Sequence, residues 1–211
     1  MMGATRAVLV TAKAAFGSPH EGRAASAWWQ VVRESMVAAL AHVAREKVCV
    51  ISVSATPGAV LALVAVGKAL LQTYKNGDRC EDKGALDRIA HSVPDWSPAR
   101  GSTGGLAYAI LLQAQDPARI GHKADRMHHH LTWGWVGDYS SALKTGYDPL
   151  TGRWPDWLED AGLDRARLHH VVPAVSLVGI LADLSVARLE DVCRTAGTLP
   201  DFILPAFATG I

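Results

Sequence analysis

The chain has 211 residues, of which 49% are hydrophobic, so it can bury a sizeable core without disulfides. Its 21 Lys and Arg residues nearly balance its 20 Asp and Glu residues, which excludes a global basic field for nucleic acid and leaves such contacts to a local patch. The three cysteines form no CxxC pair, which argues against a disulfide framework and a cysteine zinc site and predicts a reducing, cytoplasmic location.

The N-terminal quarter permits a strand–helix–strand–helix order. Residues 6–12 and the β-branched run 48–54 predict two short strands. An apolar stripe at helical spacing predicts a long helix over 24–46. Thr56-Pro57 is a helix-start signal, and it predicts a buried helix over 57–75.

Neither the N-terminus nor the uncharged stretch 48–67 has the pattern of a targeting or membrane segment. The first 16 residues lack the long apolar region of a signal peptide. The stretch 48–67 has serine, threonine, proline and glycine in its first half, whereas a membrane span needs about 20 predominantly apolar residues. We therefore expect no contact with a membrane.

The rest of the chain is predicted to be helical, with long loops at 93–105 and 145–155. Helices are expected over 83–91, 105–115, 117–131 and 164–170, after Pro173, and from Ser185 to about Ala196. The predicted fold class is mainly α, a helical bundle-like domain with two short N-terminal β-strands. Residues 1–211 are expected to form one domain, with a division into 1–92 and 93–211 as the alternative.

The predicted helix 117–131 carries a basic stripe beside its apolar face. Four side chains recur at i, i+4, i+7 and i+11, namely Arg119, Lys123, Arg126 and His130. Such groups repel one another unless they are solvated or face an anion, and a phosphate backbone fits this spacing. Arg100, in the preceding glycine-rich loop, extends the patch. The stripe predicts contact with RNA or DNA, and a solvated helix face is the alternative.

The opposite face of the same predicted helix combines His122, Asp125 and His129 at i, i+3 and i+7. Two imidazoles and a carboxylate on one face suit a divalent metal ion with open positions for water. The alternative is an exposed surface on which Asp125 pairs with His129. We predict no cofactor, and the metal set remains an alternative.

Catalytic motifs are absent from the sequence. No serine lies in a GxSxG elbow, and the GSTGG run 101–105 lacks the Walker lysine of a P-loop. An α/β-type enzyme remains an alternative, with Gly17-Ser18 or Thr56-Pro57-Gly58 at strand ends and a histidine as general base. A metal-dependent hydrolase using His122, Asp125 and His129 is the third hypothesis.

The segment from Ala85 to Trp135 contains ALDRIAHSVPDW, then GGLAYAILLQ, then HHHLTWGW. This order resembles the small, all-helical subunit of CRISPR effector complexes. The resemblance implies a non-catalytic subunit that holds nucleic acid through Arg119, Lys123 and Arg126. The basic stripe, the absence of catalytic motifs and the tryptophan-rich, apolar-tailed surface carry the leading hypothesis. It is a non-enzymatic assembly subunit that contacts a nucleic-acid backbone within a larger complex of protein subunits.

Overall fold

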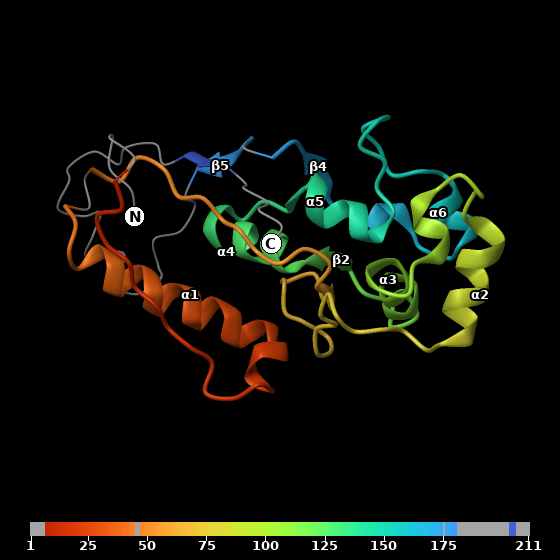
Figure 1. Ribbon diagram of the computed structural model, residues 1–211, viewed down its shortest axis with the longest axis horizontal. Coiled ribbons are helices and arrows are strands. Elements are labelled where there is room, and N and C mark those ends of the chain that lie inside the picture. Colours follow the sequence, from red (N-terminus) through yellow and green to blue (C-terminus); the bar gives the residue numbers. More distant parts are fainter. Residues whose placement is uncertain (1–6, 45–46, 175, 181–202, 206–211) are drawn as a thin grey trace.

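The computed structural model describes residues 7–44, 47–174, 176–180 and 203–205, and in these ranges it is a mixed α/β structure (Figure 1). The helices are α1 (Ala25–Leu40), α2 (Lys83–Ser92), α3 (Gly105–Gln113), α4 (Lys123–Thr132), α5 (Tyr139–Ala142) and α6 (Trp157–Asp160). The 3-10 turns are η1 (Glu21–Arg23), η3 (Pro98–Gly101), η4 (Leu143–Thr145) and η5 (Arg165–Arg167). The strands are β1 (Val60–Leu63), β2 (Arg119–His122), β3 (Val136–Asp138), β4 (His170–Val172), β5 (Leu177–Ile180) and β6 (Ile203–Pro205).

The described strands pair two by two. β1 lies antiparallel to β2 with Val60 opposite His122, and β5 lies antiparallel to β6. β3 and β4 are parallel, with Val136 opposite His170. β1 is buried at all four positions, which explains its continuous apolar sequence VLAL.

The larger core surrounds α3. This helix is apolar almost all round, and it buries Leu106, Ile110 and Leu112 completely or nearly so. It packs against β1, α2 and η4, and α2 contributes Ile89 to the same cluster. Figure 1 shows α3 between the central strands and the end of the molecule at which α2 and α6 lie.

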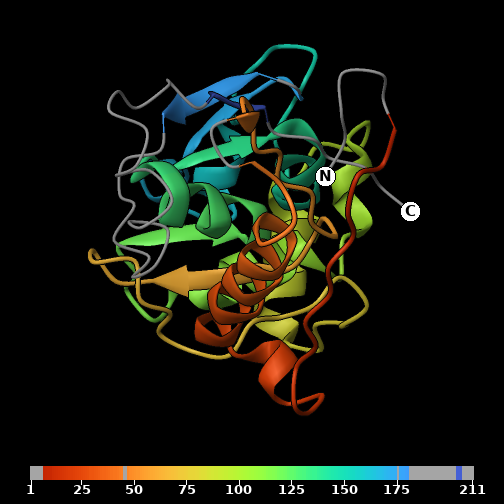
Figure 2. The same cartoon turned by 90° about the vertical axis from the view of Figure 1, so that its left-hand side faces the viewer.

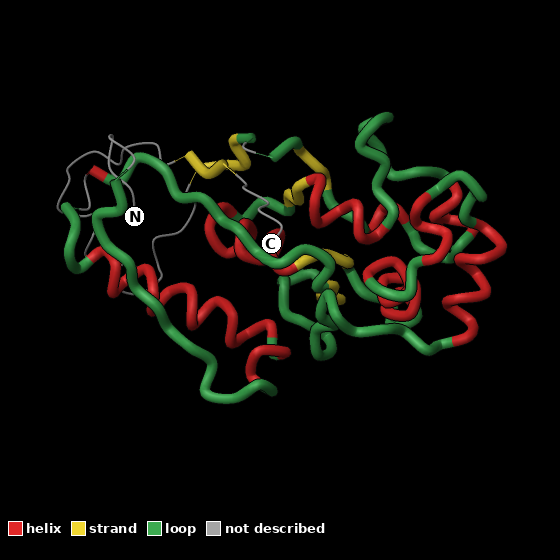
Figure 3. The backbone as a smooth tube through the Cα atoms, in the orientation of Figure 1, coloured by secondary structure: helices red, strands yellow, loops and turns green. Residues whose placement is uncertain are grey.

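A second core lies under α1. Trp28 of α1 packs with Leu61 and Leu63 of β1 and with Met127 of α4, and its indole N–H donates to the carbonyl of Gly22 at 3.0 Å. Figure 2 looks at the molecule from the side of α1. Figure 3 shows that long loops, drawn in green, precede and follow this helix. The two cores meet at the β1–β2 pair, which therefore lies at the centre of the fold.

Three of the predicted helices are confirmed. The predicted helix 24–46 corresponds to α1, which ends at Leu40, and the helices predicted over 83–91 and 105–115 correspond to α2 and α3. In each case local signals agree with the tertiary packing. Asp82, for example, caps α2 because its carboxylate accepts the backbone N–H of Ala85 at 2.8 Å.

The predicted fold class, a mainly α bundle, is wrong, and so are the positions of the strands. Neither 7–12 nor 48–54 forms a strand among the described residues. The helix predicted over 57–75 is instead β1 and a returning segment, bridged at Val60–Tyr74 and Leu63–Ala69. A strand that is buried on both faces has no alternation, so its apolar run reads like a buried helix.

The region after Asp116 also differs from the prediction. Residues 119–122 form β2, so the helix predicted over 117–131 begins only at Lys123. The helix predicted over 164–170 is a short 3-10 turn followed by β4, and β5 replaces the start of the helix expected after Pro173. The predicted helix from Ser185 to Ala196 lies outside the described residues.

None of the helices in the described part of the chain is both long and apolar enough to cross a membrane.

Candidate functional site

A buried histidine–aspartate–histidine cluster forms at the junction of β2 and α4. His122 is the last residue of β2 and the N-cap of α4, and Asp125 occupies the third helical position. The Asp125 carboxylate accepts the backbone N–H of His122 at 2.6 Å. This capping contact turns the Asp125 side chain back toward His122 and into the interior.

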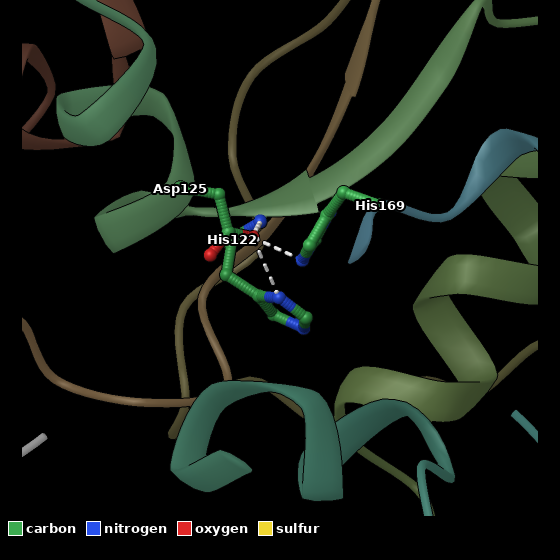
Figure 4. A group of neighbouring side chains, drawn as sticks. All are labelled: His122, Asp125 and His169. Carbon is green, nitrogen blue, oxygen red and sulfur yellow. Dashed lines mark hydrogen bonds and ion pairs between the residues drawn. The ribbon is translucent and has the colours of Figure 1, made fainter. Parts of the chain in front are cut away.

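The third member of the cluster, His169, comes from the segment that enters β4. Its Nε2 lies 2.9 Å from Oδ2 of Asp125, and Nδ1 of His122 lies 2.9 Å from the same oxygen. Figure 4 shows the two imidazoles converging on the one carboxylate. Burial by itself raises the pKa of Asp125, but the two imidazoles and their hydrogen bonds outweigh it and hold that pKa well below its ordinary value.

A pocket of about 950 Å³ lies between the loop after β1 and the loop before α3. Asn76 and Arg79 line one side, the GSTGG run 101–105 lines another, and the indole of Trp96 is 76% exposed beside them. Arg79 is exposed and has no ion pair with any described residue. This pocket therefore combines hydrogen-bond donors, an aromatic face and backbone N–H groups.

The carboxylate of the neighbouring Asp78 is already engaged in an ion pair within the chain. Arg23 of η1 donates to its two carboxylate oxygens at 2.5 and 2.9 Å, and this pairing lowers the pKa of Asp78 to about 2. The ion pair fixes the segment that carries Asn76 and Arg79. Arg79 and Lys144 are then left as the cations among the residues that line the pocket.

A second pocket of about 670 Å³ shares Asn76 and Gly77 with the first. It is lined by two lysines, Lys75 and Lys123, and by the two segments that the sequence suggests for an α/β-type enzyme, Gly17-Ser18 and Thr56. In the described part of the chain, no histidine lines either pocket.

The residues of the predicted basic stripe do not form one exposed ladder. Arg126 is 6% exposed and donates to the carbonyls of Ala25 and Gly67. His130 stacks on Trp29 with ring centroids 4.8 Å apart. Burial, with Arg126 and His129 nearby, lowers the pKa of His130 to about 4.

The other basic residues have partners of their own. The ammonium group of Lys123 lies 5.0 Å from the centroid of the Trp28 ring, and Arg119 lies on β2 with its guanidinium 5.9 Å from the Trp135 ring. Arg100 pairs with Asp95 at 3.0 Å and donates to the carbonyl of Val93. Aromatic and backbone groups of the chain itself thus contact these cations.

The predicted metal set is divided by the structure. His122 and Asp125 are brought together, but His129 stacks on Trp135 at 3.9 Å and contacts the carbonyl of Trp133 at 3.1 Å. His169 is not predicted from the sequence, because no local spacing relates it to α4. Arg79 and Trp96 are not predicted either, since they share no helix face and come to one pocket only through the fold.

The arrangement of the described elements is similar to part of the α/β structures of several carbohydrate kinases. Xylulose kinase from Rhodospirillum rubrum is similar with a TM-score of 0.68 and 18% identity, covering 94% of this chain and 43% of that chain. Gluconate kinase from Lactobacillus acidophilus is similar with a TM-score of 0.66 and 13% identity, covering 88% of this chain and 39% of that chain. Glycerol kinase from Plasmodium falciparum, solved with ADP, is similar with a TM-score of 0.67 and 12% identity, covering 94% of this chain and 42% of that chain.

The chain thus spans about two fifths of the length of these kinases. No family model and no curated protein sequence matches it. The likeness at these low identities is a likeness of fold.

These comparisons correct two of the expectations drawn from the sequence. The resemblance to the CRISPR subunit is wrong, because the structural neighbours are sugar kinases, and the RNA-binding role that it implied has no support. The α/β fold that the comparisons show agrees with the α/β alternative and not with an all-helical subunit.

Proposed function

We propose that this chain forms the substrate-binding part of an enzyme that phosphorylates a sugar or a sugar-like polyol. The observation that carries the proposal is the 950 Å³ pocket in which Arg79, Asn76 and Trp96 meet the 101–105 loop. The fold of the named kinases supports the same reading, since each of them acts on a polyhydroxy compound according to its name.

The pocket has the groups that polyhydroxy compounds need. A sugar presents hydroxyl groups, which bind charged or amide donors, and C–H faces, which pack on aromatic rings. Arg79 offers a guanidinium that is not engaged by a described carboxylate, and the Trp96 indole offers an exposed ring. The volume suits a small ligand, since ligand pockets measure roughly 300–1,000 Å³.

The 101–105 loop adds a third recognition element, because it leads directly into α3. The backbone N–H groups at a helix N-terminus favour an anionic or strongly polar ligand group. Gly105 packs closely here, since a Cβ at this position would lie 2.6 Å from the carbonyl oxygen of Lys144. The glycine therefore allows η4 and α3 to close one wall of the pocket.

In the proposed reaction, a substrate hydroxyl oxygen attacks the terminal phosphorus of a nucleoside triphosphate, and the nucleoside diphosphate leaves. The hydroxyl proton passes to a base, and positioning supplies most of the rate enhancement. Since this chain spans about two fifths of the kinases that it resembles, we assign it the binding of the substrate and leave the nucleotide site outside the proposal.

Binding by isothermal titration calorimetry tests the proposal, with D-xylulose, D-gluconate and glycerol as ligands. At least one of these compounds should bind. Arg79→Ala should weaken its binding about tenfold or more, because a hydrogen bond to a charged group contributes about 1.5–3 kcal/mol. Trp96→Ala should weaken its binding to a similar extent, because the variant lacks the ring on which the C–H face packs. Both side chains are exposed, so their removal should leave the fold intact.

Lys68→Ala is the matched control, since it removes an exposed cation that lines neither pocket. It should bind like the wild type. Absence of binding to all three compounds at millimolar concentration, or equal loss in the control, would refute the assignment.

A further inference from the structure

We infer that His122, Asp125 and His169 bind one divalent metal ion of the zinc class, which fixes the β2–α4 junction to the segment entering β4. The donor atoms are Nδ1 of His122, Oδ2 of Asp125 and Nε2 of His169, all within 4.8 Å of one another. This site is separate from the proposed substrate pocket, because none of its three residues lines either pocket.

The spacing of the donor atoms suits such an ion. Zinc binds imidazole nitrogen and carboxylate oxygen at about 2.0–2.2 Å in tetrahedral geometry, which places neighbouring donors about 3.3 Å apart. Both nitrogens lie 2.9 Å from Oδ2 of Asp125. Small side-chain rotations that widen these two separations bring all three donors to bonding distance from one central ion.

The hydrogen bonds around His122 indicate which nitrogen is free to bind. The Thr145 hydroxyl donates to the carbonyl of Ala142 at 3.1 Å, so its oxygen is left to accept a hydrogen bond from Nε2 of His122 at 3.3 Å. Nε2 therefore already has a polar neighbour, and Nδ1 is the ring nitrogen that faces the Asp125 carboxylate. Nδ1 lies 2.9 Å from Oδ2, so a proton or a metal ion must lie between these two atoms.

Burial makes the need for a cation stronger. Asp125 is 0% exposed, and the only charged or protonatable partners of its carboxylate among the described residues are the two imidazoles. Its second oxygen, Oδ1, is buried without a hydrogen-bond partner in that part of the chain, and Nε2 of His169 is buried 2.9 Å from Oδ2. A buried carboxylate is costly, and a coordinated cation compensates its charge.

The walls of the cluster consist of backbone. A Cβ at Gly137 would lie 2.2 Å from Nε2 of His169 and 2.9 Å from Oδ1 of Asp125, and one at Gly121 would lie 3.4 Å from Oδ2. β2 and β3 can therefore approach the donors only because these positions lack side chains. The chain itself therefore encloses the three donor atoms and separates them from bulk solvent.

The experiment starts from the full chain purified without a histidine tag. Elemental analysis by mass spectrometry should find about one zinc ion per chain, either as purified or after addition of zinc and gel filtration. Removal by EDTA should lower the melting temperature by about 5 °C or more, because an ion that binds only the folded state stabilises it. Cobalt(II) supplied to the stripped protein should give the visible absorption of a tetrahedral site.

The variants Asp125→Asn and His169→Gln should reduce bound zinc to less than a tenth of the wild-type amount. The matched control is His170→Gln, because His170 is the neighbouring histidine and is exposed. His129→Gln is the second control, since this residue stacks on Trp135 away from the cluster. Both controls should retain about one ion per chain.

Two results would overturn the inference. Wild-type protein that binds no zinc and melts at the same temperature with and without EDTA would mean that protons alone hold the cluster together. Loss of zinc in the His170 or His129 control would place the ion elsewhere. The measurements on wild-type protein decide the question even if the variants fold poorly.

Discussion

Arg126 illustrates how the meaning of a single residue depends on its surroundings. In the sequence it is one of four evenly spaced basic groups, a pattern that is typical of an exposed face. In the structure its guanidinium is buried and satisfies the carbonyls of Ala25 and Gly67. Its long side chain thus links α4 to the start of α1 and to the turn after β1, which are far apart in the sequence.

His130 gives a prediction at the scale of one residue. Its pKa is lowered to about 4 by burial and by Arg126 and His129, whereas an ordinary histidine in the unfolded chain titrates near 6.5. The unfolded chain therefore binds more protons between these values, and the protein should lose stability as the pH falls from about 6.5 to about 4. His130→Phe keeps an aromatic ring on Trp29 and should reduce this loss.

Urea unfolding at several pH values measures the effect. Above pH 7, the difference in the free energy of unfolding between His130→Phe and the wild type should be constant. Below pH 6.5, this difference should change in favour of His130→Phe. His42→Gln, at an exposed histidine, serves as the control and should follow the wild type. A variant with the same acid sensitivity as the wild type would contradict the burial of His130.

At the scale of elements, the Arg23–Asp78 pair connects η1 to the loop after β1. The pKa of Asp78 is lowered to about 2 by its hydrogen bond with Arg23, against about 3.9 for an ordinary aspartate. The pair should therefore stabilise the fold fully above about pH 4 and lose that contribution as the pH falls toward 2. Since both side chains are partly exposed, the contribution is screened by salt.

Asp78→Asn tests this connection. The variant should be less stable than the wild type at pH 7, and the difference should shrink as the pH approaches 2, as followed by thermal unfolding with circular dichroism. Asp95→Asn is the control, because the side chain of Asp95 is 90% exposed where it pairs with Arg100. This variant should change the stability little at any pH. A difference between Asp78→Asn and wild type that is independent of pH would exclude the ion pair as its cause.

The elements also differ in how well the sequence predicts them. α1, α2 and α3 have periodic or continuous apolar patterns, which act within one or two turns, and α2 also has a side-chain N-cap at Asp82. The strands are only three or four residues long and depend on partners elsewhere, as β1 depends on β2. Short apolar runs such as VLAL do not distinguish a strand from a helix, so the predictions fail there.

At the scale of the whole molecule, the proposed pocket and the proposed metal site lie in different places. The pocket lies between the loops that flank α2, whereas the cluster joins β2, α4 and the segment before β4. Removing the ion should therefore lower the melting temperature and leave sugar affinity unchanged within about twofold at 20 °C. Calorimetric titration of the bound sugar, before and after EDTA treatment, measures this separation.

The two proposals can fail independently. A chain that binds zinc but no sugar would retain the structural site and lose the kinase-type assignment. A chain that binds sugar but is unaffected by zinc or EDTA would retain the kinase-type assignment and lose the metal site. Loss of sugar binding together with the metal would show that the two regions are coupled through the fold.

The sequence by itself determined the features that act over short distances. These are the three helices predicted over 24–46, 83–91 and 105–115, which the structure has at 25–40, 83–92 and 105–113, and the proximity of His122 and Asp125. Each depends on side chains within about two helical turns of one another, where spacing along the chain is also spacing in the molecule.

Only the tertiary structure decided the rest. It placed 119–122 in a strand opposite β1, buried Arg126, and brought His169 within 2.9 Å of Asp125. It also assembled Arg79, Trp96 and the 101–105 loop around one pocket. Strand pairing and burial depend on residues that are distant in the sequence, so no local pattern predicts which of them will meet.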